Sequence, residues 1–231
     1  MGRKIIYIPN LLCEEIYEVI NRIDEIQMRI YTIKEDLSIE QGMLERKFCG
    51  NEVILLQSNF GNDIKDELDI IKKNGGNIIF DATHCALDLR AVKKYSAYSD
   101  VVFISIRKSL PIIDGGIVLG RRTISKEKTR TVNKDVLIIG ILSLLMMIAR
   151  SIELRIANGK GLNLIINNII EKIMQRNFSR ARSMSLVSKR IIKKIDYAKA
   201  NRITKRNRFI LGRLLSTNKN LQLVVDPKMD T

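Results

Sequence analysis

An acid and the only histidine of the chain lie close together after one strongly apolar segment. Residues 78–84 read Ile-Ile-Phe-Asp-Ala-Thr-His, so Asp81 ends the apolar run and His84 follows three positions later. In open α/β sheets, ligands bind at the carboxyl ends of the strands. Asp81 and His84 are therefore candidates for binding a ligand and for holding or moving a proton there.

A lysine follows the next apolar segment in the same way. Lys108 lies two positions after the segment 101–106, and Ser105 precedes it by three positions. The chain continues with Pro111 and with Asp114-Gly115-Gly116, which are typical of a shaped loop. The pattern indicates an amine held at the end of a strand, 27 positions after Asp81.

The elements that must position these side chains alternate between strands and helices. Short apolar runs predict strands at residues 4–8, 27–33, 53–57, 77–80, 101–106 and 116–119. Helical spacing lies between them, with Asn10 and Asn62 as expected N-caps and Gly75-Gly76 as an expected stop. This order predicts an α/β fold in which a mostly parallel sheet lies between helices.

The second half of the chain has a different pattern. Segments 133–157, 161–177 and 184–216 have helical spacing, and the polar residues 123–134 are the expected hinge before them. Residues 1–120 carry 15 Lys or Arg against 18 Asp or Glu, whereas residues 121–231 carry 25 against 7. All of the net charge of +15 therefore belongs to the helical half.

Composition excludes several classes of protein. With 45% hydrophobic and 28% charged residues, the chain is predicted to be folded rather than disordered. The longest apolar run, residues 136–149, is shorter than a membrane span and is predicted to be a buried helix. Three cysteines without a signal peptide favour a reducing cytoplasm over a disulfide framework.

The ordered motifs resemble one family. Asp81-x-x-His84, Ser105-x-x-Lys108 and Asp114-Gly115-Gly116 are similar in kind and spacing to those of the DegT/DnrJ/EryC1/StrS sugar aminotransferases, which are fold-type I enzymes dependent on pyridoxal 5′-phosphate (PLP). Further similar pieces are residues 55–61, Arg182-Ser183-Met184-Ser185 and Arg206-Asn207. The resemblance covers about residues 4–120 well and residues 180–215 loosely.

The resemblance implies roles for individual residues. Lys108 would form a Schiff base with PLP and act as general base and acid, and Asp81 would face the pyridine nitrogen. Ser105 would donate a hydrogen bond to the cofactor phosphate. His84 would lie either near the phenolic oxygen or over the ring, and both alternatives stay open. The implied reaction moves an amino group from an amino donor to a nucleotide-linked keto sugar, for polysaccharide or antibiotic-type sugar synthesis.

The resemblance also sets expectations for the whole chain. It implies the three-layer sheet of PLP-dependent transferases, with residues 1–125 as the cofactor-binding domain and residues 126–231 as a helical connection and partial small domain. Relative to the family, the chain looks truncated at both ends, and none of its 13 glycines is followed by Ser or Thr as in the family's phosphate-binding loop. The truncation makes an inactive protein one expectation. Members of the family build their active site at a dimer interface, so the resemblance also implies a homodimer.

Two other functions compete with the enzyme. The basic helices at residues 180–213 could bind nucleic acid or an anionic membrane surface, although they contain few aromatic residues and no known binding motif. The chain could also be a catalytically silent subunit of the same fold. Zinc spacing, a Gly-x-Ser-x-Gly elbow, a Walker loop and Gly-x-Gly-x-x-Gly are all absent from the sequence, so no metal is expected.

Overall fold

The structure is a computed structural model that describes most of the first half of the chain and the region around residues 184–221. The described residues are 4–110, 112, 114–120, 184–218, 220 and 221, with isolated positions between 138 and 172. Apart from such isolated positions, the predicted segments 123–134, 133–157 and 161–177, and with them the apolar run 136–149, lie outside the described residues, as do Arg182 and Ser183.

The chain divides into two compact units. The first comprises Met1–Ser109, Ile117–Ile124 and Ile195–Thr231, and the second comprises Leu110–Gly116 and Ser125–Lys194. The candidate residues Asp81, His84, Ser105 and Lys108 all belong to the first unit.

A six-stranded sheet forms the centre of the first unit. Its strands lie in the order β2-β1-β3-β4-β5-β6, and their bounds are β1 Lys4–Pro9, β2 Ile26–Tyr31, β3 Glu52–Gln57, β4 Asn77–Asp81, β5 Val101–Ile104 and β6 Ile117–Gly120. The first five strands of this order are parallel, and β6 pairs with β5 in the antiparallel direction. The predicted α/β fold with a mostly parallel sheet is therefore confirmed.

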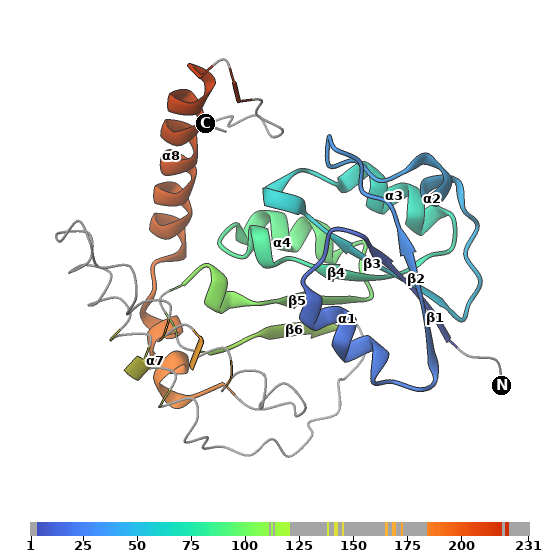
Figure 1. Ribbon diagram of the computed structural model, residues 1–231, viewed down its shortest axis with the longest axis horizontal. Coiled ribbons are helices and arrows are strands. Elements are labelled where there is room, and N and C mark those ends of the chain that lie inside the picture. Colours follow the sequence, from blue (N-terminus) through green and yellow to red (C-terminus); the bar gives the residue numbers. More distant parts are fainter. Residues whose placement is uncertain are drawn as a thin grey trace. The chain divides into compact units, whose positions relative to one another are not determined.

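Helices cover both faces of this sheet (Figure 1). Their bounds are α1 Glu14–Asn21, α2 Gln41–Glu45, α3 Lys65–Lys73 and α4 Leu89–Ser96. Ile20 of α1 packs with Ile6, Ile8 and Leu55 on one face. On the other face the ring of Phe80 meets that of Tyr95 in α4, with centroids 5.1 Å apart. Alternate residues of each strand thus fill two cores, as expected for a sheet buried on both sides.

Three short 3₁₀ helices follow strands at the carboxyl edge of the sheet. They are η1 Asn59–Gly61 after β3, η2 Thr83–Cys85 after β4 and η3 Ile106–Lys108 after β5. The predicted strand 101–106 therefore ends two residues early, because Ile106 already belongs to η3. This turn places Lys108 beyond the strand rather than in line with it.

Both predicted N-caps are wrong. The N-cap of α1 is Cys13, and the side chain of Asn10 instead accepts a hydrogen bond from the Ile33 N–H at 2.8 Å. The N-cap of α3 is Ile64, and Asn62 only follows η1. Neither N-cap residue makes a side-chain cap, although the Lys65 N–H at the start of α3 donates to the Asp63 carboxylate at 3.1 Å. The first turn of α1 depends on acidic residues near the helix dipole and on packing. The predicted stop is confirmed, because α3 ends just before Gly75, whose φ is +84°.

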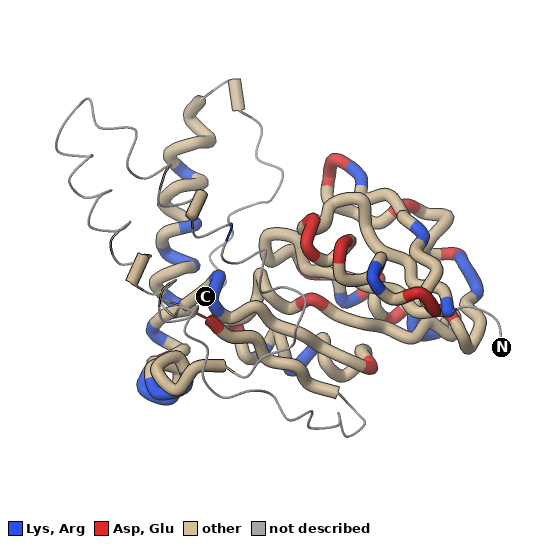
Figure 2. Tube along the Cα trace, turned by 60° about the horizontal axis from the view of Figure 1, so that its bottom comes forward, with Lys and Arg blue, Asp and Glu red and all other residues tan. Residues whose placement is uncertain are grey.

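The segment predicted to be helical over residues 184–216 contains two helices. In the second unit, α7 spans Leu186–Lys194, and in the first unit α8 spans Tyr197–Ser216. The break falls at Ile195-Asp196, where the Asp196 side chain accepts a hydrogen bond from the Lys199 N–H at 2.9 Å and so caps α8. Lys and Arg recur along α8 (Figure 2). Among the described residues, no helix is long and apolar enough to cross a membrane.

Candidate functional site

Asp81 lies at the carboxyl end of β4, in the middle of the sheet. In the strand register it is opposite Gln57 of β3 and Phe103 of β5. One carboxylate oxygen accepts a hydrogen bond from the Thr83 N–H at 2.9 Å and thereby shapes the turn. Within the described part of the chain, no Lys or Arg forms an ion pair with this carboxylate. The other oxygen therefore keeps its capacity to accept a proton donor from a ligand.

The negative charge at Asp81 also acts on a neighbouring thiol. Cys85 is a buried residue of η2, and burial together with the charges of Asp88 and Asp81 raises the pKa of its thiol to about 12. A thiol with such a pKa stays protonated at neutral pH and is a poor nucleophile. Cys85 is thus a packing residue of this site rather than a reactive group.

His84 is held by the turn that follows β3. Its Nδ1 accepts a hydrogen bond from the Phe60 N–H at 3.0 Å, and the two rings stack with centroids 5.5 Å apart. Because Nδ1 is an acceptor, a neutral His84 carries its proton on Nε2. The Phe60 backbone has a φ of +52°, an uncommon value for a residue with a side chain. This left-handed turn is what brings the Phe60 N–H to the imidazole.

Ser105 and Lys108 follow β5. The Ser105 N–H donates to the Thr83 hydroxyl at 3.0 Å, so one hydrogen bond ties the loop after β4 to the loop after β5. The Lys108 N–H then donates to the Ser105 carbonyl at 3.1 Å within η3. The Ser105 hydroxyl makes no hydrogen bond to a described residue and is only half-buried. It can therefore donate to a ligand.

The Lys108 amine reaches a residue that follows a different strand. Its Nζ lies 3.3 Å from Sγ of Cys13, in the segment after β1. In the sheet, β1 and β5 are separated by β3 and β4, so their axes are about 14 Å apart at the usual strand spacing. The two segments must therefore approach each other over the carboxyl ends of β3 and β4. Lys108 and Cys13 meet above the edge at which Asp81 lies.

Gln57 fixes the segment after β1 in this position. Its side-chain amide donates to the Leu11 carbonyl and, at 2.5 Å, to the Asn59 side chain. The sheet end thus gathers an amine, a carboxylate, a free hydroxyl and an imidazole on loops that hydrogen bonds connect. These are the group types that an aldehyde cofactor with a ring nitrogen and a phosphate requires. The four predicted site residues all lie at this edge.

Sequence reasoning missed the residues that organise the edge. The sequence indicates no role for Thr83, an unspecified position of Asp81-x-x-His84, or for Cys13, one of three cysteines, and Phe60 stands out only as part of residues 55–61. Their roles depend on contacts across 22, 95 and 24 positions. No local pattern in the sequence indicates such partners, although a predicted parallel sheet does imply that segments after its strands meet.

The Asp114-Gly115-Gly116 motif has a structural role in the second unit. The Asp114 carboxylate accepts hydrogen bonds from the Ser185 N–H at 2.8 Å, the Ser185 hydroxyl at 2.7 Å and the Ser188 hydroxyl at 2.5 Å. Gly115 has a φ of +130°, and a Cβ there would collide with the Met184 side chain. Two of the motifs that carry the family resemblance therefore meet at the start of α7.

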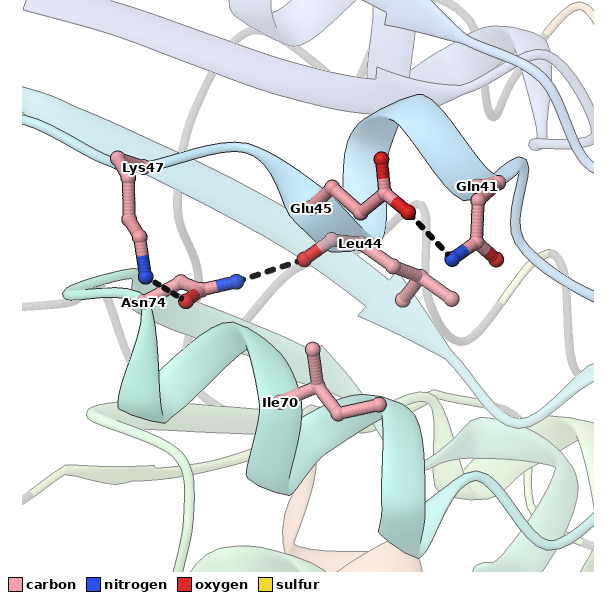
Figure 3. Close-up of a pocket in the computed structure, with 6 residues that line it drawn as sticks. All are labelled: Gln41, Leu44, Glu45, Lys47, Ile70 and Asn74. Atoms are coloured by element: carbon pink, nitrogen blue, oxygen red, sulfur yellow. Dashed lines mark hydrogen bonds between the residues drawn. The ribbon is translucent and has the colours of Figure 1, made fainter.

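A pocket between α2 and α3 offers no comparable chemistry (Figure 3). Its polar side chains bind one another: Gln41 donates to Glu45 at 2.8 Å, and Lys47 donates to Asn74 at 2.6 Å. The Asn74 amide donates in turn to the Leu44 carbonyl at 2.7 Å. Across the described ranges, no group of three or more His, Cys, Asp or Glu is placed to hold a metal ion.

No protein-family model matches the chain, and no curated protein does. Solved structures resemble part of it. Serine palmitoyltransferase of Sphingomonas wittichii is 16% identical with a TM-score of 0.41, and the match covers 52% of this chain and 33% of the enzyme. A PLP-bound putative aminotransferase from Clostridium difficile 630 is 14% identical with a TM-score of 0.40, covering 64% and 41%.

A NifS-like protein from Rickettsia africae is 16% identical with a TM-score of 0.43, covering 60% of this chain and 42% of that one. The chain thus spans about a third to two fifths of the length of these structures. At such identities and scores the likeness carries no argument about chemistry. The functional argument rests on the residues of this chain.

Proposed function

We propose that the chain binds PLP at the carboxyl edge of its sheet and belongs to the PLP-dependent aminotransferases. The observation that carries the proposal is the position of Lys108, whose amine lies over the strand ends, beside Cys13 and above the edge that Asp81 occupies. Bound PLP would supply the electron sink that stabilises a carbanion next to a nitrogen. The residues of the chain would bind, orient and move protons.

Each residue has a defined task in this proposal. The Lys108 Nζ would hold the aldehyde carbon of the cofactor and, once released, would carry a proton at the α-carbon of the amino donor. The Asp81 carboxylate would accept a hydrogen bond from the protonated pyridine nitrogen and so keep it protonated, and it has an oxygen available for this. The Ser105 hydroxyl would donate to the phosphate. The His84 Nε2–H would donate to an oxygen of cofactor or substrate.

The finer identity of the enzyme belongs to the same proposal. The ordered motifs favour a DegT/DnrJ/EryC1/StrS-type enzyme that moves an amino group from an amino donor to a keto sugar. Residues 1–125 would carry the cofactor chemistry, and residues 126–231 would supply helices, of which α8 returns to the first unit. We further propose a homodimer in a reducing cytoplasm, in accord with cysteines that are all free.

Titration with PLP tests the proposal. The purified chain should gain a visible absorbance band, and borohydride reduction should then fix one cofactor per chain on Lys108, as located by peptide mass spectrometry. Lys108→Ala should lose both signals. Lys93→Ala, which removes an exposed lysine of α4, should keep both. Absence of the band from the wild-type chain, or equal labelling of Lys93 and Lys108, would refute cofactor binding at this site.

A further inference from the structure

A larger pocket lies beside His84 in the first unit. It is formed by the turn after β3, by η2 with the start of α4, and by one side of α8, and its volume is about 810 Å³. The α8 residues that line it are Asn201, Thr204, Lys205 and Arg208. Their spacing of three and four positions places them on a single face of the helix. The size lies within the usual range of small-molecule sites.

The charged side chains of the pocket do not balance. Four basic residues line it against two acidic ones, which leaves two positive charges in excess; the six are Arg90, Lys94, Lys205, Arg208, Asp63 and Asp88. Lys94 binds Asp63 at 2.6 Å, and Lys205 lies 3.4 Å from Asp88. Both carboxylates are therefore already engaged with lysines.

The two arginines differ from these lysines. Among the described residues, neither Arg90 nor Arg208 forms an ion pair with a carboxylate. The Arg208 guanidinium lies against the turn after β3, where a Cβ on Gly61 would come within 3.2 Å of Nη1. Gly61, with a φ of +82°, is thus the residue that lets this guanidinium approach so closely.

The N-terminus of α4 does not compete for an anion in this pocket. Asp88 already accepts hydrogen bonds from the Arg90 and Ala91 N–H groups, at 3.1 and 3.0 Å. An anion must therefore be bound by side chains. Guanidinium groups are planar, permanently charged and matched to phosphate oxygens, which they bind in pairs of parallel hydrogen bonds.

We propose that this pocket binds a small ligand through a phosphate or diphosphate group, with Arg90 and Arg208 as its principal donors. An excess of two positive charges matches the charge of a phosphate ester at neutral pH. His84 lines the pocket as well as the candidate active site, so the ligand's other end can reach the carboxyl edge of the sheet. The identification of this ligand as a nucleotide-linked substrate rests on the proposed function.

Calorimetric titration of the full chain at low ionic strength tests the pocket. The probes are inorganic pyrophosphate and uridine diphosphate. Arg90→Ala and Arg208→Ala should each weaken the binding of pyrophosphate by about tenfold or more, the loss expected for a charge-assisted hydrogen-bonding pair. Tighter binding of uridine diphosphate than of pyrophosphate would show that the pocket also recognises the nucleoside. Equal binding would show that it recognises the diphosphate alone.

Matched variants separate the pocket from a general effect of charge. Arg206→Ala removes the same charge from α8, at a position that does not line the pocket, and Lys93→Ala does so from α4. Both should change the affinity less than about twofold, because exposed charges farther away are screened. Equal losses in Arg206→Ala and Arg208→Ala would overturn the proposal, and so would the absence of binding of either probe.

The pocket and the proposed cofactor site fail independently. Lys108→Ala should lose the visible band of bound PLP but keep its affinity for pyrophosphate. Arg208→Ala should keep the band and lose pyrophosphate. If PLP never binds while pyrophosphate binding still depends on Arg90 and Arg208, the proposed function is wrong and the phosphate pocket stands. If PLP displaces pyrophosphate from wild type but not from Lys108→Ala, the two sites are one, and the proposal of a separate pocket fails.

Discussion

The amine of Lys108 and the thiol of Cys13 are 3.3 Å apart, although 95 positions separate them in the chain. Both side chains are exposed, so this contact is not a consequence of core packing. It results from two segments that reach over the ends of β3 and β4 from opposite sides. Any group that enters the carboxyl edge to react with the lysine must therefore pass beside the thiol.

Blocking Cys13 should protect Lys108. Labelling of the thiol with a bulky maleimide should reduce the incorporation of PLP into Lys108, after borohydride reduction, by about fivefold or more, because the adduct occupies the space around the amine. Peptide mass spectrometry measures both modifications. The control is Cys13→Ser labelled at Cys49, the other exposed cysteine, which should incorporate PLP normally. Unchanged incorporation after complete labelling of Cys13 would show that the two side chains do not share one space.

The sequence predicted the sheet because its signals are local. Buried parallel strands are continuous apolar runs, and the predicted strands 53–57 and 77–80 contain such runs at residues 53–56 and 78–80. The position of Asp81 follows directly, since the end of a strand fixes the edge. Helix caps were less predictable. Asn10 has the right chemistry for an N-cap, but a backbone N–H 23 positions away binds its side chain instead.

The candidate site was predictable in its residue types but not in its geometry. The spacing of Asp81, Ser105 and Lys108 indicates strand ends. It does not reveal that Thr83 ties two loops together or that Lys108 turns toward Cys13. Such contacts depend on which strands are neighbours in the sheet, and that order follows from the whole chain.

Stability at alkaline pH should depend on Cys85. The pKa of its thiol is about 12 in the folded protein, against an ordinary value of 9.0. Between these values the unfolded chain loses a proton that the folded chain keeps. The contribution of the protonated Cys85 thiol to the free energy of unfolding is therefore complete below about pH 9. It is lost as pH rises toward 12, at up to about 1.4 kcal/mol per pH unit.

Urea unfolding of wild type and Cys85→Ala at pH 7.5 to 10 measures this effect. The difference in free energy of unfolding between the two proteins should be constant near neutral pH and shrink above about pH 9. The effect of tyrosines that also titrate at alkaline pH largely cancels because they are present in both proteins, although the charge of Cys85 contributes to the raised pKa of Tyr95. Parallel pH profiles over the whole range would contradict the buried, protonated thiol.

Glu52 should be the most sensitive charged residue of the first unit. Its carboxylate is buried and accepts hydrogen bonds from Arg46 at 2.6 Å, from the Cys49 N–H at 2.8 Å and from Tyr7 at 3.0 Å. Burial alone would raise the pKa of Glu52, but these three donors outweigh it and lower the pKa. Glu52→Gln should cost about 2 kcal/mol in the free energy of unfolding, because it leaves Arg46 without its charged partner.

Acid unfolding gives a second measure of the same carboxylate. A group with a lowered pKa stabilises the protein at pH values above its ordinary range and stops doing so as pH falls through its folded pKa. Wild type should therefore lose stability relative to Glu52→Gln as pH falls below about 4.5. Glu45→Gln, which alters an exposed carboxylate bonded to Gln41, should cost less than about 0.5 kcal/mol and is the matched control.

Asp114 should determine whether α7 begins at Leu186. Its carboxylate accepts hydrogen bonds from the Ser185 N–H and from the Ser185 and Ser188 hydroxyls, while the Ser188 N–H donates to the Ser185 hydroxyl at 3.2 Å. Asp114→Ala removes the acceptor that orients Ser185, so the first turn of α7 should open more often. The expected loss is about 1 kcal/mol of local stability, which corresponds to roughly fivefold faster hydrogen exchange of the Ser188 amide.

The comparison with a second cap makes this test specific. Asp196→Ala removes the N-cap of α8 and should accelerate exchange of the Lys199 amide instead, without affecting Ser188. Because α7 and α8 follow each other with only two residues between them, a general loosening of this region would speed exchange at both amides in both variants. Selective acceleration would be faster exchange of Ser188 in Asp114→Ala and of Lys199 in Asp196→Ala. This result would assign Asp114 to the start of α7 and give the Asp-Gly-Gly motif a role in folding.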